Sequence, residues 1–280
     1  MTKVQNNSNT LPESQNLDFK NLNLPTHKYT YKYDCFLMVP NFLIRHDIKE
    51  TLNVNRILLM VYLFIYTRRT YEDVAFFTIR QLLDFCGYKT TRHKPKMFYE
   101  VIRCLLFLKW NNMVDVDFDP SDVSYDQVLE AMVIEENFIP ASDFTRLYIA
   151  DFDSIMEIEC TVSKEIVLSV YLYICSFIGN YTHNMCSSVI QSDNDNPNAF
   201  WKSITAISKH LSLSKTTITQ CLDILTTEHG NNKSLLVKRE TGNIYIGESL
   251  QLQRTPNIYV LNKYGHEKEI ELTIKKLQGT

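Results

Sequence analysis

Residues 57–65 read Ile-Leu-Leu-Met-Val-Tyr-Leu-Phe-Ile, and residues 166–174 read Ile-Val-Leu-Ser-Val-Tyr-Leu-Tyr-Ile. Six of the nine positions are identical at a constant offset. Both stretches are almost wholly apolar, which is typical of a helix that is buried on all sides. A capping residue precedes each stretch, Asn53 or Asn55 in the first copy and Ser163 in the second. We therefore expect an internal repeat built around two buried helices.

Two further helices and a strand are predicted after the first copy. In residues 77–85 the apolar side chains have helical spacing, and Gly87 is placed to end that helix. Pro95 suits the first position of the next helix, which carries apolar residues up to Leu106. Residues 113–118 then alternate like a strand.

The second copy is followed by the same order of elements. Residues 203–211 form a short helix with its apolar side chains on one face, and residues 212–214 form a turn. Ser214 is an N-cap for a helix over residues 215–226. Residues 240–243 are predicted to form a hairpin turn between strands, and residues 257–261 return as a further strand.

Helix, helix, turn, helix and hairpin is the order of a winged helix. We therefore expect a mainly α fold with small β-hairpins, in the α+β class, built from tandem winged-helix repeats. The expected parts are a disordered arm, a first winged-helix unit, an acidic connecting segment and a second winged-helix unit, over residues 1–27, 28–117, 118–160 and 161–280. Within the acidic segment the pattern favours a helix over residues 125–132 and strands near residues 133–138 and 147–149.

Charge is segregated along the chain, although the formal net charge is only −3. Residues 28–117 carry 14 basic and 9 acidic side chains, and residues 161–280 carry 12 and 10. Residues 118–160 carry one basic side chain, Arg146, and 11 acidic ones. Two mildly basic units flanking an acidic segment are compatible with binding to nucleic acid.

The helix after each predicted turn is the element that a helix-turn-helix protein places in the major groove. Short polar and basic side chains there can reach bases and phosphates. Five cationic or potentially cationic groups lie between Lys89 and Lys96, the densest such cluster in the chain. In the first unit the candidate DNA-binding residues are Lys89, Thr90, Thr91, Arg92, His93, Lys94, Lys96 and Tyr99. In the second unit they are Ser214, Lys215, Thr216, Thr217, Thr219 and Gln220, with Lys238, Arg239 and Arg254 on the hairpin. The competing interpretations are a solvated loop, a capped surface helix and a solvated hairpin.

Two short stretches carry a family resemblance. Residues 36–44, Phe-Leu-Met-Val-Pro-Asn-Phe-Leu-Ile, are similar to the entry strand of plasmid replication-initiator domains. Residues 254–261, Arg-Thr-Pro-Asn-Ile-Tyr-Val-Leu, resemble the closing strand of a winged-helix wing. Together with the tandem array, over residues 33–262, the chain resembles replication initiators and replisome organisers of bacterial plasmids and phages. The resemblance implies binding to repeated origin sequences and recruitment of host replication proteins. The negative net charge and the acidic middle depart from it.

Catalytic motifs are missing from the sequence. It has no phosphate-binding Gly-x-x-x-x-Gly-Lys-Ser/Thr loop, no paired histidines and no Gly-x-Ser-x-Gly. Asp-x-Asp pairs could hold a divalent metal on a strand, but acidic segments contain such pairs by chance. They occur at Asp115/Asp117, Asp117/Asp119, Asp151/Asp153 and Asp193/Asp195. His183 and Cys186 lack the further ligands of a zinc site. We expect no enzyme activity, no cofactor and no metal.

The spacing of the cysteines and the hydropathy of the chain indicate the compartment in which we expect the protein. The seven cysteines are widely spaced, which favours reduced thiols. No apolar stretch reaches the length of a membrane span, and no signal pattern begins the chain. We expect a cytoplasmic protein that binds double-stranded DNA, and a homodimer is compatible with it. A transcriptional regulator of the same fold and a winged-helix module that docks proteins remain alternatives. The acidic segment is either a solvated linker, a docking surface for a basic partner or an electrostatic brake on DNA binding.

Overall fold

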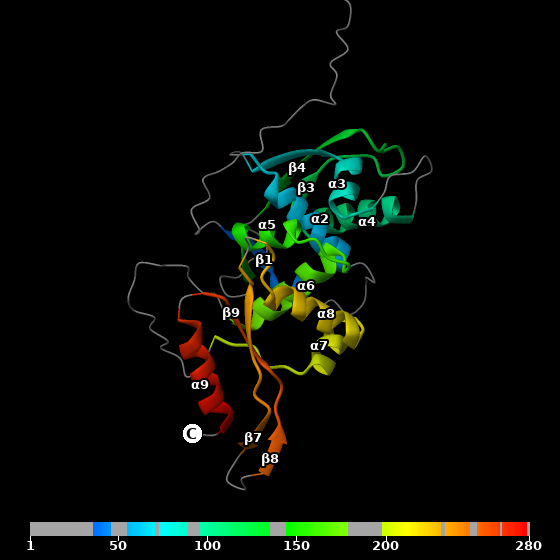
Figure 1. Cartoon of the computed structure of the whole chain (residues 1–280). Coiled ribbons are helices and arrows are strands. Elements are labelled where there is room, and N and C mark those ends of the chain that lie inside the picture. The colour runs from blue at the N-terminus through cyan, green and yellow to red at the C-terminus, as the bar shows by residue number, and fades with distance from the viewer. Residues whose placement is uncertain are drawn as a thin grey trace, which may run out of the picture. The chain divides into compact units, whose positions relative to one another are not determined.

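In the computed structural model the two repeated stretches form helices that pack against each other (Figure 1). The first stretch lies in α2 (Asn55–Thr67) and the second in α6 (Lys164–Ile178). Both helices are buried along almost their whole length, so the prediction of two buried helices is confirmed. The structure describes residues 36–45, 55–70, 73–88, 96–134, 144–178, 198–230, 233–246, 251–263 and 265–278, with backbone alone for residues 55, 243–246 and 251–254.

Equivalent entry strands join the two halves of the chain, which are the described residues up to 134 and those from 144 onward. β1 (Phe36–Pro40) leads directly into α1 (Asn41–Arg45), and β5 (Phe144–Tyr148) leads directly into α5 (Ile149–Glu157). The two strands pair antiparallel, with Met38 opposite Arg146. The buried Thr145 hydroxyl donates to Asn41 Oδ1 across this pair at 2.6 Å, which satisfies two polar groups in the core.

The first half continues with a three-stranded antiparallel sheet and two helices. The sheet has the order β2 (Val74–Thr78), β4 (Val128–Val133) and β3 (Val114–Val116). Thr78 and Gln81 form a capping box at the start of the first of these helices, and Gly87 follows it with a φ of 79°. The helix predicted within residues 77–85 is present from Ile79, while Phe77 and Thr78 belong to the preceding strand, and the helix predicted after Pro95 is confirmed. The elements are β2 (Val74–Thr78), α3 (Ile79–Phe85), α4 (Lys96–Trp110), β3 (Val114–Val116) and β4 (Val128–Val133).

The helix predicted over residues 125–132 is wrong, because this stretch holds the central strand β4. Leu129, Ala131 and Val133 are buried and alternate with exposed side chains, which is the period of a strand with one face on the core. β2 and β3 pair with its two edges. The acidic segment 118–160 is therefore more than a connection, since it supplies β4, β5 and α5. The strand predicted near residues 147–149 is present as β5, and residues 135–143 lie outside the described part.

The second half has the same order of helices and a long two-stranded ribbon. The central strand is β9 (Ile258–Leu261). Its Tyr259 forms an isolated β-bridge with Phe200, which precedes the helices, and β6 (Leu236–Arg239) pairs with the other edge of β9. β7 pairs with β8 in the same register as β6 with β9. The elements are α7 (Ile204–Leu211), α8 (Lys215–Thr226), β6 (Leu236–Arg239), β7 (Asn243–Ile246), β8 (Gln251–Arg254) and β9 (Ile258–Leu261).

The hairpin turn predicted at residues 240–243 is wrong. Lys238 pairs with Tyr259 and Asn243 pairs with Arg254, so the ribbon runs on through this stretch. Gly242 adopts a φ of 61°, and its carbonyl accepts a hydrogen bond from the Thr255 amide at 3.2 Å. A glycine in this left-handed conformation accommodates a local distortion inside a strand pair as readily as a reversal of the chain.

A final helix, α9 (His266–Gln278), packs on β9 and is not among the predicted elements. Ile270 joins Val260 and Ile258 in a small second hydrophobic cluster. The buried Glu269 carboxylate accepts a hydrogen bond from the Asn198 amide at 2.8 Å. This helix has few apolar side chains, so its position depends on the ribbon beneath it.

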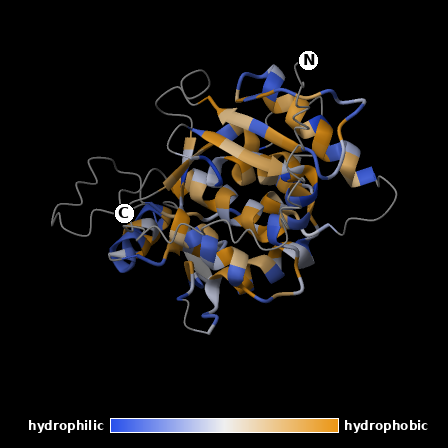
Figure 2. Cartoon of the chain, turned by 90° about the horizontal axis from the view of Figure 1, so that it is seen from above, coloured by the Kyte–Doolittle hydropathy of each residue, from blue (hydrophilic) through white to orange (hydrophobic). Residues whose placement is uncertain are grey.

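One hydrophobic core runs through both halves, from Leu37 in β1 to Leu261 in β9. Figure 2 shows the central helices in the hydrophobic colours and the outer helices with much of their surface hydrophilic. The mixture of helices with small antiparallel sheets places the fold in the α+β class. No helix of the described residues is both long and apolar enough to cross a membrane.

Candidate nucleic-acid interface

Among the described residues, α7, a tight turn and α8 form the main candidate for a nucleic-acid interface. Ser203 caps α7 by accepting from the Ala206 amide at 3.2 Å, and Ser214 caps α8 by accepting from the Thr217 amide at 3.0 Å. Ser212 adopts the left-handed conformation, with a φ of 51°. The Ser208 hydroxyl donates to the Leu213 carbonyl at 2.6 Å and closes the turn. These bonds set the direction of α8 relative to α7.

The inner face of α8 anchors this unit to the core. Ile218, Leu222 and Leu225 are buried with Ile207 and Leu211 of α7. Helical periodicity then turns the intervening residues of α8 toward solvent. The side chains exposed there are Ser214, Lys215, Thr216, Thr219 and Gln220.

The polar side chains of α8 differ in what they can offer a ligand. The Ser214 and Thr217 hydroxyl oxygens lie 2.8 Å apart and satisfy each other. The Thr219 hydroxyl donates to the Lys215 carbonyl at 3.0 Å, which leaves its oxygen able to accept. No ion pair or side-chain hydrogen bond is found for Lys215 or Gln220 among the described residues. These two long side chains are the donors best placed to reach a ligand.

The ribbon brings a further cation toward α8. Lys238 is exposed on β6 and pairs with Glu240 at 2.8 Å, and this carboxylate raises the pKa of Lys238. Asp223 of α8 adds to the same shift. Arg239, its neighbour on β6, is exposed. Arg254 belongs to β8, and its side chain lies outside the described part.

Only two of the candidate residues of the first half lie in the described part. Residues 89–95 are outside it, so Lys89, Thr90, Thr91, Arg92, His93 and Lys94 have no described position. Lys96 and Tyr99 are exposed on the first turn of α4. Arg103, which sequence reasoning missed, follows Tyr99 by one helical turn and pairs with Glu100 at 3.0 Å. Its spacing from Tyr99 was the signal that could have found it.

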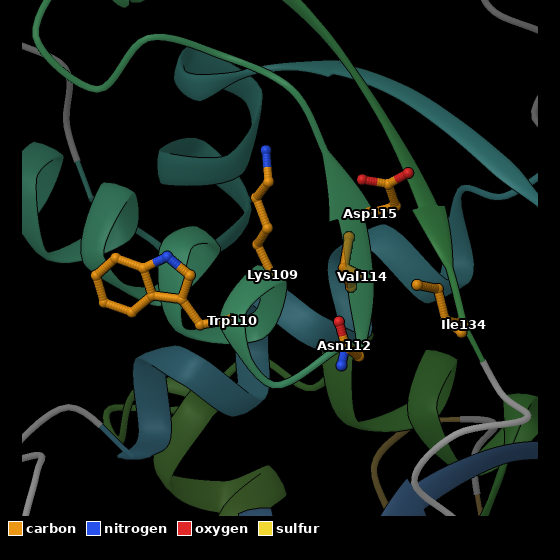
Figure 3. Close-up of a pocket in the computed structure, with 6 residues that line it drawn as sticks. All are labelled: Lys109, Trp110, Asn112, Val114, Asp115 and Ile134. Atoms are coloured by element: carbon orange, nitrogen blue, oxygen red, sulfur yellow. The ribbon is translucent and has the colours of Figure 1, made fainter.

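A surface pocket lies at the other end of α4 (Figure 3). Its polar side chains do not converge, since Lys109 and Asp115 point different ways and Trp110 is exposed. Because α4 has 15 residues, the pocket is about 20 Å along the helix from Lys96. It therefore adds nothing to the interface. Its lining residues are Lys109, Trp110, Asn112, Val114, Asp115 and Ile134.

Three of the Asp-x-Asp carboxylates have separate partners. Asp117 pairs with Lys109 at 3.5 Å, Asp119 accepts from the Ser121 hydroxyl at 2.6 Å, and Asp151 accepts from the Tyr171 hydroxyl at 2.6 Å. Within the ranges that the structure describes, no three metal-ligating side chains gather. Asp193, Asp195, His183 and Cys186 lie outside those ranges. The five cysteines inside them are free thiols.

Comparisons with protein-family models and with curated proteins find no match to this chain.

Proposed function

We propose that the chain binds double-stranded DNA through two winged-helix units, with α8 as the principal recognition helix. The observation that carries the proposal is the outer face of α8. It presents Lys215 and Gln220 to solvent on a helix whose start is capped and whose inner face is buried. A helix held this rigidly can place a few side chains against base edges in the major groove.

The order of elements supports assigning each half to the winged-helix class. The first half contains the buried helix α2, the strand β2, the helices α3 and α4 and the strands β3 and β4, and β4 lies between β2 and β3 in the sheet. In the second half β9 has the same place between Phe200 and β6. The role that we propose is replication initiation for a plasmid or phage, on the resemblance of residues 33–262. Regulation of transcription would use the same interface.

The test begins with selection of binding sites from a randomised duplex pool, followed by fluorescence anisotropy at several salt concentrations. Gln220→Ala should relax the preference at one base pair, because glutamine pairs with adenine through two hydrogen bonds. Lys215→Ala should weaken all sites and lower the salt slope by about 0.9, the value for one phosphate contact. Lys268→Ala removes an exposed charge from α9 and is the matched control. A wild-type chain that binds no duplex at low salt would refute the proposal.

A second candidate function is protein docking, and the outer face of the β2-β4-β3 sheet favours it. Phe76, Val128 and Met132 are 53%, 66% and 41% exposed on neighbouring strands. Adjacent exposed apolar side chains of this size mark interaction surfaces. We propose that this face binds a second copy of the chain. Sedimentation equilibrium tests whether two copies of the chain associate through this face. The wild type should be a dimer, and Phe76→Lys should be a monomer.

A further inference from the structure

Two cationic side chains from different halves of the chain lie over one aromatic ring. The Lys202 ammonium nitrogen is 3.5 Å from the centroid of the Phe177 ring, and the Arg45 guanidinium carbon is 4.7 Å from it. Arg45 is the last residue of α1, Phe177 is in the last turn of α6, and Lys202 immediately precedes the capping residue of α7. The Phe177 side chain is 36% exposed, so solvent reaches this cluster.

Hydrogen bonds to α6 hold the arginine in place. Arg45 Nε donates to the Ser176 hydroxyl at 3.3 Å, and an Nη2 hydrogen bond goes to the Ser176 carbonyl. This carbonyl is at the negative end of the α6 dipole. The guanidinium is therefore fixed before any ligand arrives, and binding costs little side-chain entropy.

The cluster has an excess of positive charge. Neither cation takes part in an ion pair with a carboxylate among the described residues. Burial and the charge of Arg45 both lower the pKa of Lys202. The aromatic ring offers partial compensation through its negative face. An anion between the two cations would remove their repulsion and keep the lysine protonated.

The place of Lys202 in the fold indicates which anion this is. Lys202 stands at the N-terminus of α7, and in a helix-turn-helix the first helix crosses the DNA backbone. The free amides and the dipole of a helix N-terminus favour negative charge at the same point. Both cations cover the Phe177 ring, so a nucleic-acid base cannot easily stack on that ring. A phosphate, in contrast, can reach the two cations directly.

We propose that Arg45 and Lys202 form a binding site for a backbone phosphate of the DNA that α8 reads. The inference rests on the proposed function and deepens it. It makes Arg45, a residue of the first half, part of the interface of the second half. Packing alone explains each side chain separately, with Arg45 on the α6 carbonyl and Lys202 over the ring. It does not explain two cations at one ring without a carboxylate.

The experiment measures duplex binding of the full chain over a range of salt concentrations with Lys202→Gln, which leaves the α6 contact of Arg45 intact. The variant should lose roughly tenfold in affinity, the effect of one charge-assisted hydrogen bond. Its salt slope should fall by about 0.9. Arg45→Gln should give a similar loss, and the double variant little more, because both side chains hold one phosphate. Lys209→Gln, an exposed lysine of α7, is the control for charge alone.

A second arm separates this inference from the proposed function. Thermal unfolding is followed in chloride and in inorganic phosphate at equal ionic strength, and phosphate should raise the Tm of the wild type more than that of Lys202→Gln. A wild type that binds DNA while Lys202→Gln keeps its affinity and slope would overturn the phosphate site alone. Stabilisation by phosphate without any DNA binding would assign the site to free phosphate and overturn the DNA ligand.

Discussion

Serine hydroxyls control where α7 and α8 begin. The Ser203 and Ser214 hydroxyl oxygens each accept a hydrogen bond from a backbone amide in the first turn of the helix that follows. Ser212, between the helices, adopts the left-handed conformation that non-glycine residues seldom take. A small polar side chain at each of these positions lets the chain change direction over three residues. The direction of the α8 surface therefore depends on single hydroxyl groups.

We predict that Ser214→Ala lowers the free energy of unfolding by about 1 kcal/mol, because the Thr217 amide loses its acceptor. Ser214→Asp should retain the cap and most of the stability. If α8 contacts DNA, the aspartate should still weaken binding through repulsion from phosphate. Urea unfolding and anisotropy of the three proteins measure the two effects separately. Equal stability of all three would show that the cap contributes nothing.

The strand ribbon is a single element that two threonines and a glycine hold together. The Thr255 hydroxyl donates to the Thr241 hydroxyl at 2.7 Å, and the Thr241 hydroxyl donates to the Pro256 carbonyl at 3.0 Å. Gly242 lies at the same point with a positive φ. These contacts keep β6–β9 and β7–β8 in one register where the strand pairing is interrupted.

We predict that Gly242→Ala destabilises the protein by about 1 kcal/mol. Apart from Gly242 and its two chain neighbours, no atom lies within 4 Å of the added Cβ, so the loss comes from the left-handed backbone and not from a clash. Gly242→Asn should lose less, because asparagine tolerates this conformation better. Urea unfolding compares the three, and hydrogen exchange of the Thr255 amide reports on the ribbon locally. An alanine variant as stable as the wild type would contradict the assigned backbone conformation.

At the scale of the whole molecule, the two halves share one core through α2, α6 and the β1–β5 pair. Neither buried helix belongs to one half alone, because each packs against the other. Unfolding one half would expose the apolar face of the other. The halves should therefore unfold in one cooperative transition.

The two tryptophans of the chain test this cooperativity, since Trp110 lies in the first half and Trp201 in the second. Trp110→Phe and Trp201→Phe each leave one reporter, and their urea transitions should coincide. Adding Leu172→Ala, in the fully buried part of α6, should shift both transitions equally, by roughly 2–5 kcal/mol. Two separate midpoints would show that the halves are independent domains.

Buried thiols should make stability depend on alkaline pH. Burial raises the pKa of Cys86 and of Cys221 to about 12, from the ordinary thiol value of 9.0. Between these values the unfolded chain loses a proton that the folded chain retains, so stability falls as the pH rises above about 9. Each thiol contributes up to about 1.4 kcal/mol per pH unit.

Cys221→Ala should therefore have a shallower decline of the unfolding free energy between neutral pH and pH 10.5 than the wild type, in the presence of a reductant. Leu222→Ala is the control, because it should lower stability by a similar amount at every pH and leave the slope unchanged. An unchanged slope in Cys221→Ala would show that this thiol ionises equally in both states.

Periodicity and capping signals in the sequence determined the helices α2, α3, α4, α6, α7 and α8. The apolar repeat of residues 57–65 and 166–174, the spacing of Ile218 and Leu222, and the Ser214 cap are local patterns, and local patterns set helices. The exposed face of α8 follows from the same periodicity. The sequence also placed the polar candidates Lys215 and Gln220 on that face.

Only the tertiary structure decided which strands pair and which distant side chains meet. Residues 125–132 have too few apolar positions to separate a strand from a helix, and β2 and β3 settle the matter by pairing with β4. The register of β6 with β9 depends on partners 19 to 25 residues apart, such as Lys238 and Tyr259. Arg45, Phe177 and Lys202 meet because α1 and α6 belong to one core. Such contacts depend on how the chain closes its long loops around that core, and no short-range pattern records them.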